Sequence, residues 1–222
     1  HIHDRRQRQM CIRDSLLPGC DPNQRREIYL SMNDTIAKLH NVDFDKVNLA
    51  DYGKHENYMD RQIHRWTKQY KDSETQMIPE INELIEWLPK NIPSDQETSI
   101  VHGDFRLDNM IFDPITHEVK AILDWELSTL GNPIADFTYH MMSWRLPAGA
   151  KGLGMMGSDL KSLNIPSESE YAELYYKKTG REKIDNWDFY MAYNIFRLAG
   201  IAQGIVGRVR DGTASSSEAK NY

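Results

Sequence analysis

The chain has 222 residues, of which 40% are hydrophobic and 27% charged, a composition typical of a soluble globular protein that can bury a core. Its formal net charge of −6 argues against non-specific binding to nucleic acid. The apolar runs are too short to span a bilayer and no signal peptide is visible, so we expect no membrane partner and a cytoplasmic location. Cys11 and Cys20 lack partners at metal-ligand spacing, which indicates neither a disulfide framework nor a zinc site.

The two ends of the chain differ in character from the part between them. Residues 1–15 are basic and show no amphipathic period, so we interpret them as a disordered or non-native segment. An ordinary flexible terminus explains them nearly as well. Residues 214–222 are small and polar and are predicted to form a flexible tail, which leaves residues 16–213 as the folded domain.

Helices are predicted throughout the first part of that domain. Asp21 and Gln24 form a capping box ahead of apolar residues that recur at helical spacing. Two further amphipathic helices are expected over residues 58–70 and 74–90.

The periodicity changes from helical to extended near the middle of the chain. Residues 99–101 form a short apolar run that leads into a polar loop. Residues 110–112 and 119–123 are predicted to be two strands, and residues 113–117 join them as a turn. The sequence therefore predicts a β-hairpin at this point.

Helices follow again after the hairpin. Residues 133–144 are predicted to form one helix, and Ser167 with Glu170 makes a capping box for another that ends at Gly180. A last long helix is expected over residues 186–206. The predicted fold class is therefore α+β and mostly helical, with one central β-hairpin.

Large aromatic side chains are concentrated in these predicted elements. We interpret them as core residues in preference to a binding platform, because aromatic rings at helical spacing most often pack inward. They are Trp66, Tyr70, Trp87, Trp125, Tyr171, Tyr175 and Tyr176.

The chemically informative residues lie on either side of the predicted hairpin. Asp104 falls in the loop before it, Asn109 where its first strand begins, and Asp124 where its second strand ends. Folding the hairpin brings Asn109 and Asp124 side by side, and a carboxylate beside an amide oxygen suits Mg²⁺ at a phosphate site. Asp104 can then reach a substrate hydroxyl beside that metal, which is the arrangement that phosphoryl transfer needs.

Three motifs in this region resemble those of one family. Residues 102–109 read HGDFRLDN, residues 122–126 read ILDWE, and residues 130–137 read LGNPIADF with a GxPxxD pattern. They resemble the catalytic, metal-binding and supporting segments of the aminoglycoside and choline kinase-like phosphotransferases, which are relatives of the protein kinases. The resemblance covers about residues 16–213 and implies the C-terminal lobe of a protein kinase-like fold.

The resemblance also implies roles for individual residues. Asp104 would be the catalytic base, and Asn109 and Asp124 would bind Mg²⁺ and, through it, ATP. Asp136 would support the catalytic loop through hydrogen bonds, and His102 would be a second support behind the reacting groups.

Two further charged residues have alternative interpretations. Glu126 would bind a second metal ion or a metal-bound water, with a solvent-facing position as an equal alternative. Arg106 could contact a phosphate or an acidic substrate, although a surface ion pair is the commoner role for such an arginine.

Other segments are similar to one subfamily. These are residues 65–70 (RWTKQY), 124–133 (DWELSTLGNP) and 188–194 (DFYMAYN). The subfamily comprises bacterial phosphotransferase-family proteins and the N-terminal kinase domain of acyl-CoA dehydrogenase family members ten and eleven. This resemblance implies a small hydroxylated substrate such as a hydroxyacyl-CoA rather than an antibiotic.

The sequence departs from the family pattern where ATP should be held. Helices are predicted ahead of Asp104, where the family has an N-terminal lobe with a Gly-rich loop and a strand lysine. Residues 148–157 are Gly-rich, but they follow the metal site and lack the lysine-serine pair of a P-loop. We therefore expect a truncated form without the N-terminal lobe. Two alternatives stay open: a non-catalytic, pseudokinase-like binding module, and a metal-dependent hydrolase using Asp104, Asp124 and Glu126.

Overall fold

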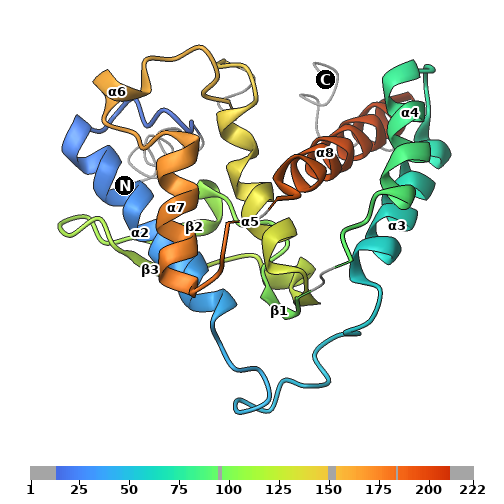
Figure 1. Ribbon diagram of the computed structural model, residues 1–222. Coiled ribbons are helices and arrows are strands. Elements are labelled where there is room, and N and C mark those ends of the chain that lie inside the picture. Colours follow the sequence, from blue (N-terminus) through green and yellow to red (C-terminus); the bar gives the residue numbers. More distant parts are fainter. Residues whose placement is uncertain (1–13, 95–96, 150–153, 184, 211–222) are drawn as a thin grey trace. The chain divides into compact units, whose positions relative to one another are not determined.

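The computed structural model describes residues 14–94, 97–149, 154–183 and 185–210 (Figure 1). The chain divides into two compact units. One contains the segments up to residue 54 and from 97 to 185, and the other contains the segments from 55 to 96 and from 186 onward.

The predicted segment 1–15 and the predicted tail 214–222 lie outside the described residues, apart from Asp14 and Ser15. Those two residues are hydrogen-bonded to their surroundings. The Tyr29 hydroxyl donates to the Ser15 carbonyl oxygen at 2.6 Å, and the Leu16 N–H donates to Asp14 Oδ1 at 2.9 Å. The hydrogen-bonded structure of the first unit therefore includes Asp14 and Ser15.

Two helices with capping boxes lie side by side in the first unit (Figure 1). Helix α2 (Pro22–His40) begins at Asp21, whose side chain accepts hydrogen bonds from the first turn. Helix α7 (Glu168–Thr179) begins at Ser167 in the same way and ends at Gly180, whose φ of 70° is left-handed. Both capping boxes and the glycine stop are as predicted, because each depends on residues only a few positions apart.

The described strands of the first unit form two antiparallel pairs. Strands β2 (Met110–Phe112) and β3 (Val119–Ile122) form the predicted hairpin. Strand β1 (Ser99–Val101) pairs with β4 (Thr129–Gly131), which the sequence did not predict. A three-residue strand with no alternation of apolar and polar residues gives no detectable period. The β1–β4 pair places the loop after β1 close to the segment that leads into the next helix.

That next helix is α5 (Pro133–Met141), and it is capped by Asn132. The Asn132 side-chain oxygen accepts hydrogen bonds from the backbone N–H groups of Ile134 and Ala135, at 2.9 and 3.0 Å. The helix continues as a 3₁₀ turn over Met142–Trp144, so the predicted helix over residues 133–144 is confirmed with a tighter last turn. The short helix α6 (Leu160–Leu163) was not predicted.

The core of the first unit is built around stacked aromatic rings. Phe137 stacks on Tyr175 with ring centroids 3.8 Å apart and on Tyr171 at 6.0 Å. All three rings are fully buried, so the predicted core positions of the two tyrosines are confirmed. The prediction was wrong for Trp125, which is 40% exposed, while Tyr176 is only half-buried.

The second unit is helical in its described part. Helix α3 (Tyr58–Ser73) packs against α8 (Trp187–Arg210), and α4 (Pro79–Trp87) also contacts α8. Trp66 and Tyr70 on α3 are buried as predicted.

The α3–α8 contact is close because α8 carries glycines on the facing side. A Cβ built on Gly207 would lie 3.2 Å from Ser73, and one built on Gly200 would lie 3.7 Å from Trp66. The first distance is tighter than ordinary van der Waals contact, so a side chain at Gly207 would require Ser73 to shift by a few tenths of an ångström.

The third predicted helix is shorter than expected. Helix α4 begins at Pro79, and Ile78 before it is extended, with φ −115° and ψ 108°. A proline ring clashes with a helical conformation of the preceding residue, and this clash excludes the predicted start at residue 74. Trp87, predicted to be core, is 43% exposed at the end of this helix. Within the described residues, none of the helices combines the length and apolarity needed to cross a lipid bilayer.

Candidate active site

Three segments of the first unit meet around residues 102–109, which we call the HGD loop. Strand β1 leads directly into this loop, and the β2–β3 hairpin follows it, with Asp124 two residues after the end of β3. Helix α5 contributes Asp136 from its first turn. The three sequence motifs therefore lie on three different elements of one unit.

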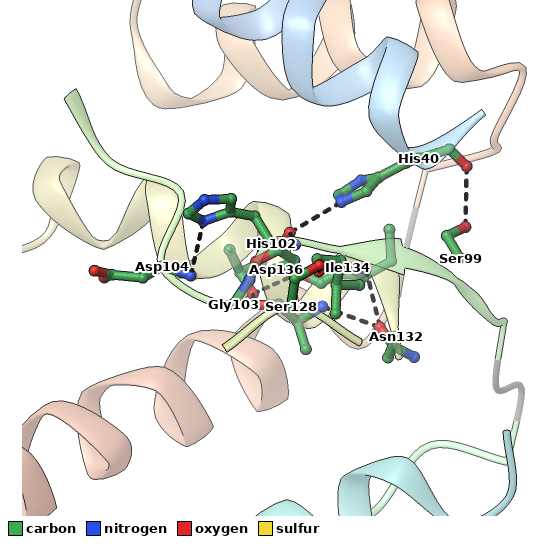
Figure 2. Close-up of polar contacts among 12 residues, drawn as sticks. His40, Ser99, His102, Gly103, Asp104, Ser128, Asn132, Ile134 and Asp136 are labelled. Atoms are coloured by element: carbon green, nitrogen blue, oxygen red, sulfur yellow. Dashed lines mark hydrogen bonds and ion pairs between the residues drawn. The ribbon is translucent and has the colours of Figure 1, made fainter. Parts of the chain in front are cut away.

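The Asp136 carboxylate fastens the start of the HGD loop to α5 (Figure 2). Its Oδ2 accepts a hydrogen bond from the His102 backbone N–H at 2.8 Å, and its Oδ1 accepts one from the Gly103 N–H at 2.8 Å. The His40 Nε2 lies 3.2 Å from Oδ2 and completes the set of donors. The predicted supporting position of Asp136 thus coincides with direct hydrogen bonds to the loop backbone.

The buried pair of Asp136 and His40 is best described as a carboxylate beside a neutral imidazole. Burial would raise the pKa of Asp136, but the hydrogen bonds from His40 and from the loop backbone outweigh it and hold this pKa below its usual value. Burial lowers the pKa of His40, which disfavours the charged imidazolium. The other ring nitrogen, Nδ1, is 2.7 Å from the Tyr175 hydroxyl. Since Nε2 donates to Asp136, Nδ1 accepts from Tyr175.

His102 connects the HGD loop to the end of the hairpin. Its Nε2 is 2.9 Å from the Leu123 carbonyl oxygen, and its Nδ1 is 3.2 Å from the Asp104 N–H. A carbonyl can only accept and an N–H can only donate, so the ring is neutral with its proton on Nε2. Its side chain is fully buried, so the ring is closed off from solvent.

Gly103 has both a conformational and a steric reason to be glycine. Its φ is 81°, in the left-handed region that residues with a Cβ rarely adopt. A Cβ at this position would lie 2.7 Å from the Leu127 carbonyl oxygen. The loop can therefore turn against Leu127 only with glycine in the middle of the motif.

Asp104 is held by three neighbouring side chains. Its Oδ1 accepts a hydrogen bond from the Tyr139 hydroxyl at 2.7 Å and lies 3.2 Å from Arg106 Nε. Its Oδ2 accepts a hydrogen bond from Asn109 Nδ2 at 2.9 Å. The Asp104 side chain is still 19% exposed, so part of the carboxylate remains open to solvent.

Asn109 and Asp124 lie at the same end of the hairpin, as predicted from the motif spacing. The Leu123 N–H donates to the Asn109 carbonyl oxygen at 2.8 Å, which extends the β2–β3 ladder to the residue before Asp124. Asp124 has a left-handed backbone with φ 63°, and its side chain is exposed. Left-handed non-glycine residues are uncommon and cluster at functional sites.

The oxygen atoms at this end of the hairpin fit a hard cation. Asn109 Nδ2 donates to the Asp104 carbonyl oxygen and to Asp104 Oδ2, both at 2.9 Å, so the orientation of the amide is fixed by two acceptors. Its Oδ1 is then left for another ligand, at the end of the hairpin from which the exposed Asp124 follows. Amide and carboxylate oxygens are the ligands that Mg²⁺ accepts.

The remaining two predicted site residues behave differently from each other. Arg106 bridges two carboxylates of the HGD loop, with Nη2 2.9 Å from Asp108 Oδ2 in addition to its contact with Asp104. Burial lowers the pKa of Arg106, but the two negative carboxylates raise it by more than burial lowers it. The pKa of Arg106 therefore lies above its usual value. Glu126 is exposed, and no hydrogen bond or ion pair among the described residues involves its side chain.

Two residues that contact the site were not predicted. Tyr139 lies three positions after Asp136 on α5, and helical residues three apart share one face, so this spacing was a usable signal. His40 is 96 positions away from Asp136 and belongs to another helix. No local pattern could have connected those two residues.

The comparison with protein families decides what kind of site this is. A family model described as the phosphotransferase enzyme family matches residues 13–174. The chain belongs to this phosphotransferase family. The predicted resemblance is therefore confirmed, and the loop at 102–109 lies within the matched residues.

Two mammalian relatives extend the same comparison. The chain is 46% identical to mouse acyl-CoA dehydrogenase family member 10 over 209 residues, which is 94% of this chain and 20% of that protein. It is 39% identical to human acyl-CoA dehydrogenase family member 11, covering 93% of this chain and 27% of that protein. The chain thus spans about a fifth to a quarter of the length of these relatives.

Solved structures show the fold independently. A protein from Ralstonia eutropha, assigned provisionally to the aminoglycoside phosphotransferases, is 52% identical with a TM-score of 0.89 and covers 94% of this chain and 64% of its own. An aminoglycoside-3'-phosphotransferase of type VIII has a TM-score of 0.58 at 15% identity, over 78% of this chain and 62% of its own. The kinase-like fold of the phosphotransferases is therefore confirmed for this chain.

Proposed function

We propose that this chain carries the reaction centre of an ATP- and Mg²⁺-dependent kinase that phosphorylates a hydroxyl group of a small molecule. One observation supports the proposal most directly. Inside a phosphotransferase-family domain, the Asn109 amide donates to the Asp104 carboxylate, and the Asn109 carbonyl oxygen accepts from Leu123, the residue before Asp124. These are the groups that phosphoryl transfer requires: a base for the hydroxyl proton and oxygen ligands for the metal.

The roles follow from the geometry of the cluster. Asp104 accepts the proton of the acceptor hydroxyl while that oxygen forms its bond to the γ-phosphorus of ATP, and the bond from this phosphorus to the bridging oxygen breaks so that ADP leaves. Asn109 Oδ1 and the Asp124 carboxylate would hold Mg²⁺, which would supply positive charge to neutralise the nucleotide phosphates. Asp136 and His102 keep the HGD loop in place through the loop backbone. Glu126 is assigned to a metal-bound water at most, because no hydrogen bond or ion pair among the described residues joins its side chain to the cluster.

The acceptor that we propose is a hydroxyacyl-CoA or a related hydroxylated metabolite. The support for this class is the identity of 46% and 39% with two proteins named as acyl-CoA dehydrogenase family members. Fold similarity alone does not fix an acceptor, since specificity in such folds depends on variable helices and loops. A cytoplasmic location and a lack of nucleic-acid and membrane partners stay predictions from composition.

A single substitution tests the assignment of the base. Asp104→Ala in the full chain should reduce phosphoryl transfer by about a hundredfold or more, because it removes the group proposed to take the proton. The assay measures transfer of labelled γ-phosphate to a panel of hydroxyacyl-CoA compounds. The control is Asp43→Ala, which removes an exposed carboxylate paired with Lys46 in the loop after α2.

The same proteins distinguish the kinase from a non-catalytic binding module. Calorimetry with Mg²⁺-ATP measures nucleotide binding separately from transfer. Binding without transfer to any acceptor would identify the pseudokinase-like alternative and overturn the proposal. Near-normal transfer by Asp104→Ala would overturn the role of Asp104, whatever the acceptor.

A further inference from the structure

The second unit contains a groove between α3 and α8, which we call the α3–α8 groove. Positions 65, 68, 69 and 72 share one face of α3 and form one wall, and positions 204, 207 and 208 share one face of α8 and form the other. The volume of the groove is about 480 Å³, which falls in the range of roughly 300–1,000 Å³ found for small-molecule sites. The α3 wall includes the segment 65–70, which the proposed reaction does not use.

The charge of the groove is opposite to that of the whole chain. The chain has a formal net charge of −6, whereas the groove is lined by the side chains of Arg65, Lys68, Arg208 and Asp72. The Lys68 ammonium pairs with Asp72, four residues further along α3, at 2.5 Å. The excess positive charge therefore comes from two guanidinium groups, one on each wall.

Arg65 is held over an aromatic ring without using its hydrogen-bond donors. Its Cζ lies 5.5 Å from the centre of the Trp66 ring, and Trp66 is itself only 5% exposed. Among the described residues, no hydrogen bond or ion pair involves the Arg65 guanidinium. An aromatic contact of this kind steadies a guanidinium, and the planar set of N–H groups matches the oxygen atoms of a phosphate.

Gly204 in the α8 wall is not required by the packing of the two helices. A Cβ on Gly207 would lie 3.2 Å from Ser73, so close packing explains that glycine. Among the described residues, a Cβ on Gly204 would meet only the ends of two flexible side chains, 3.5 Å from Gln69 Nε2 and 3.7 Å from Arg208 Nη1. Those are ordinary contact distances, and glycine inside a helix is less favourable than alanine. The missing side chain instead lets a ligand approach the α8 wall closely.

The two walls are joined by hydrogen bonds at the end of α3. The buried Gln203 donates from Nε2 to the Ser73 carbonyl oxygen at 3.1 Å and to Thr75 Oγ1 at 2.7 Å. A site whose walls are already in place loses less entropy when a ligand binds.

We propose that the α3–α8 groove is a binding site for phosphate groups carried by a small molecule. A phosphomonoester has a charge of about −1.5 to −2 near neutral pH, which matches the two guanidinium groups better than a single carboxylate does. The volume leaves room for an organic portion beside the phosphate. The site belongs to the second unit and goes beyond the proposed phosphoryl transfer.

Calorimetry on the 222-residue chain tests the proposal with two probes, CoA and inorganic diphosphate. EDTA in the buffer prevents metal-bridged phosphate binding at the reaction centre. We expect CoA to bind, and its Kd to rise about tenfold in Arg65→Gln and in Arg208→Gln, because each variant loses a charged hydrogen-bond donor. The matched control is Lys71→Gln, which removes a positive charge from α3 outside the groove. It should change Kd less than about twofold.

The two probes distinguish the source of the phosphate. Tighter binding of CoA than of diphosphate would identify a phosphorylated organic ligand, and equal binding would show that free phosphate is sufficient. Either result supports the site if both arginine variants weaken it. The proposal is overturned if neither probe binds, if both arginine variants bind like the parent chain, or if Lys71→Gln weakens binding equally.

Gly204→Ala tests the groove without changing its charge. Alanine favours the helix more than glycine does, so the thermal midpoint of unfolding should not fall. The added side chain narrows the groove, and we expect the Kd for the bound probe to rise about tenfold. A Kd equal to that of the parent chain would show that the anion binds outside the groove.

Discussion

Gly103 shows how a single residue decides whether the HGD loop can form. Its left-handed backbone and its closeness to the Leu127 carbonyl oxygen are two separate constraints. A left-handed backbone destabilises any residue with a Cβ by about 1 kcal/mol. The clash of that Cβ with the Leu127 carbonyl oxygen adds to this cost. The same glycine donates its N–H to Asp136, so any shift of Gly103 disturbs that hydrogen bond as well.

Gly103→Ala should therefore lower the free energy of unfolding by more than the strain of a left-handed alanine. We expect a loss of about 3 kcal/mol in urea unfolding, since the Cβ meets a backbone atom that cannot rotate away.

Gly180→Ala provides the matched control for the strain alone. Gly180 has a similar φ of 70°, but a Cβ there meets no atom within 4 Å. Gly180→Ala should therefore lower the free energy of unfolding by about 1 kcal/mol. Equal losses at the two positions would show that the contact with Leu127 does not matter.

Three helices of the first unit share two buried histidine contacts. His40 at the end of α2 contacts Tyr175 of α7, and His140 of α5 contacts Tyr171 of the same helix. Burial lowers the pKa of His140 to about 4, and it also lowers that of His40. Both rings are therefore neutral in the folded protein near neutral pH.

The stability of the first unit should consequently decrease as the pH falls. In the unfolded chain a histidine takes up its proton near pH 6.5, whereas His140 in the folded chain does so only near pH 4. The folded protein has the full stabilisation associated with a neutral His140 above pH 6.5. This part of the free energy of unfolding is lost as the pH falls from 6.5 toward 4. Between pH 7.5 and 5 we expect a loss of about 2 kcal/mol for His140, measured by urea unfolding at each pH.

Two variants identify the source of this pH dependence. His140→Phe keeps an aromatic ring among Phe105, Trp144 and Tyr171 and should make the decrease shallower. His64→Gln replaces an exposed histidine on α3 and should leave the decrease as it is. If the free energy of unfolding of His140→Phe fell with pH as steeply as that of the parent chain, His140 would not be the source of the pH dependence.

The elements also show which features a sequence can predict. The capping boxes at Asp21 and Ser167 were predictable because each is complete within four residues. Strand β4 was not, because three residues with no period gain their conformation from pairing with β1. In the site, motif spacing placed Asp104, Asn109 and Asp124 together. The contact of His40 with Asp136 depends on how α2 packs, which no local pattern records.

At the scale of the whole molecule, the chain passes between two units at residues 54–55, 96–97 and 185–186. Every hydrogen bond described for the HGD loop lies inside the first unit. The structure of the second unit instead includes the close packing of α3 against α8 at the glycines of α8. A disturbance of that packing should therefore be detectable separately from the site.

Gly207→Val tests this separation. The added side chain would press on Ser73 and should destabilise the α3–α8 contact by about 1–3 kcal/mol. Hydrogen exchange followed by mass spectrometry should show faster exchange in peptides from α3 and α8. The backbone N–H groups of His102 and Gly103 should keep their protection, because their acceptor is Asp136. Equal loss of protection in both units would show that they unfold together.

The fastening of the HGD loop by Asp136 has a consequence for the order of events during synthesis. Gly103 leaves the ribosome 33 residues before Asp136, whose carboxylate accepts the hydrogen bond from the Gly103 N–H. His40, the other partner of Asp136, emerges well before both. Bringing two distant segments together costs conformational entropy, and only the hydrogen bonds to Asp136 offset that cost. These bonds cannot form until Asp136 has been synthesised. A nascent chain that ends before α5 therefore exposes an HGD loop without its anchor, and we expect the phosphotransfer site to be among the last parts of the first unit to become ordered.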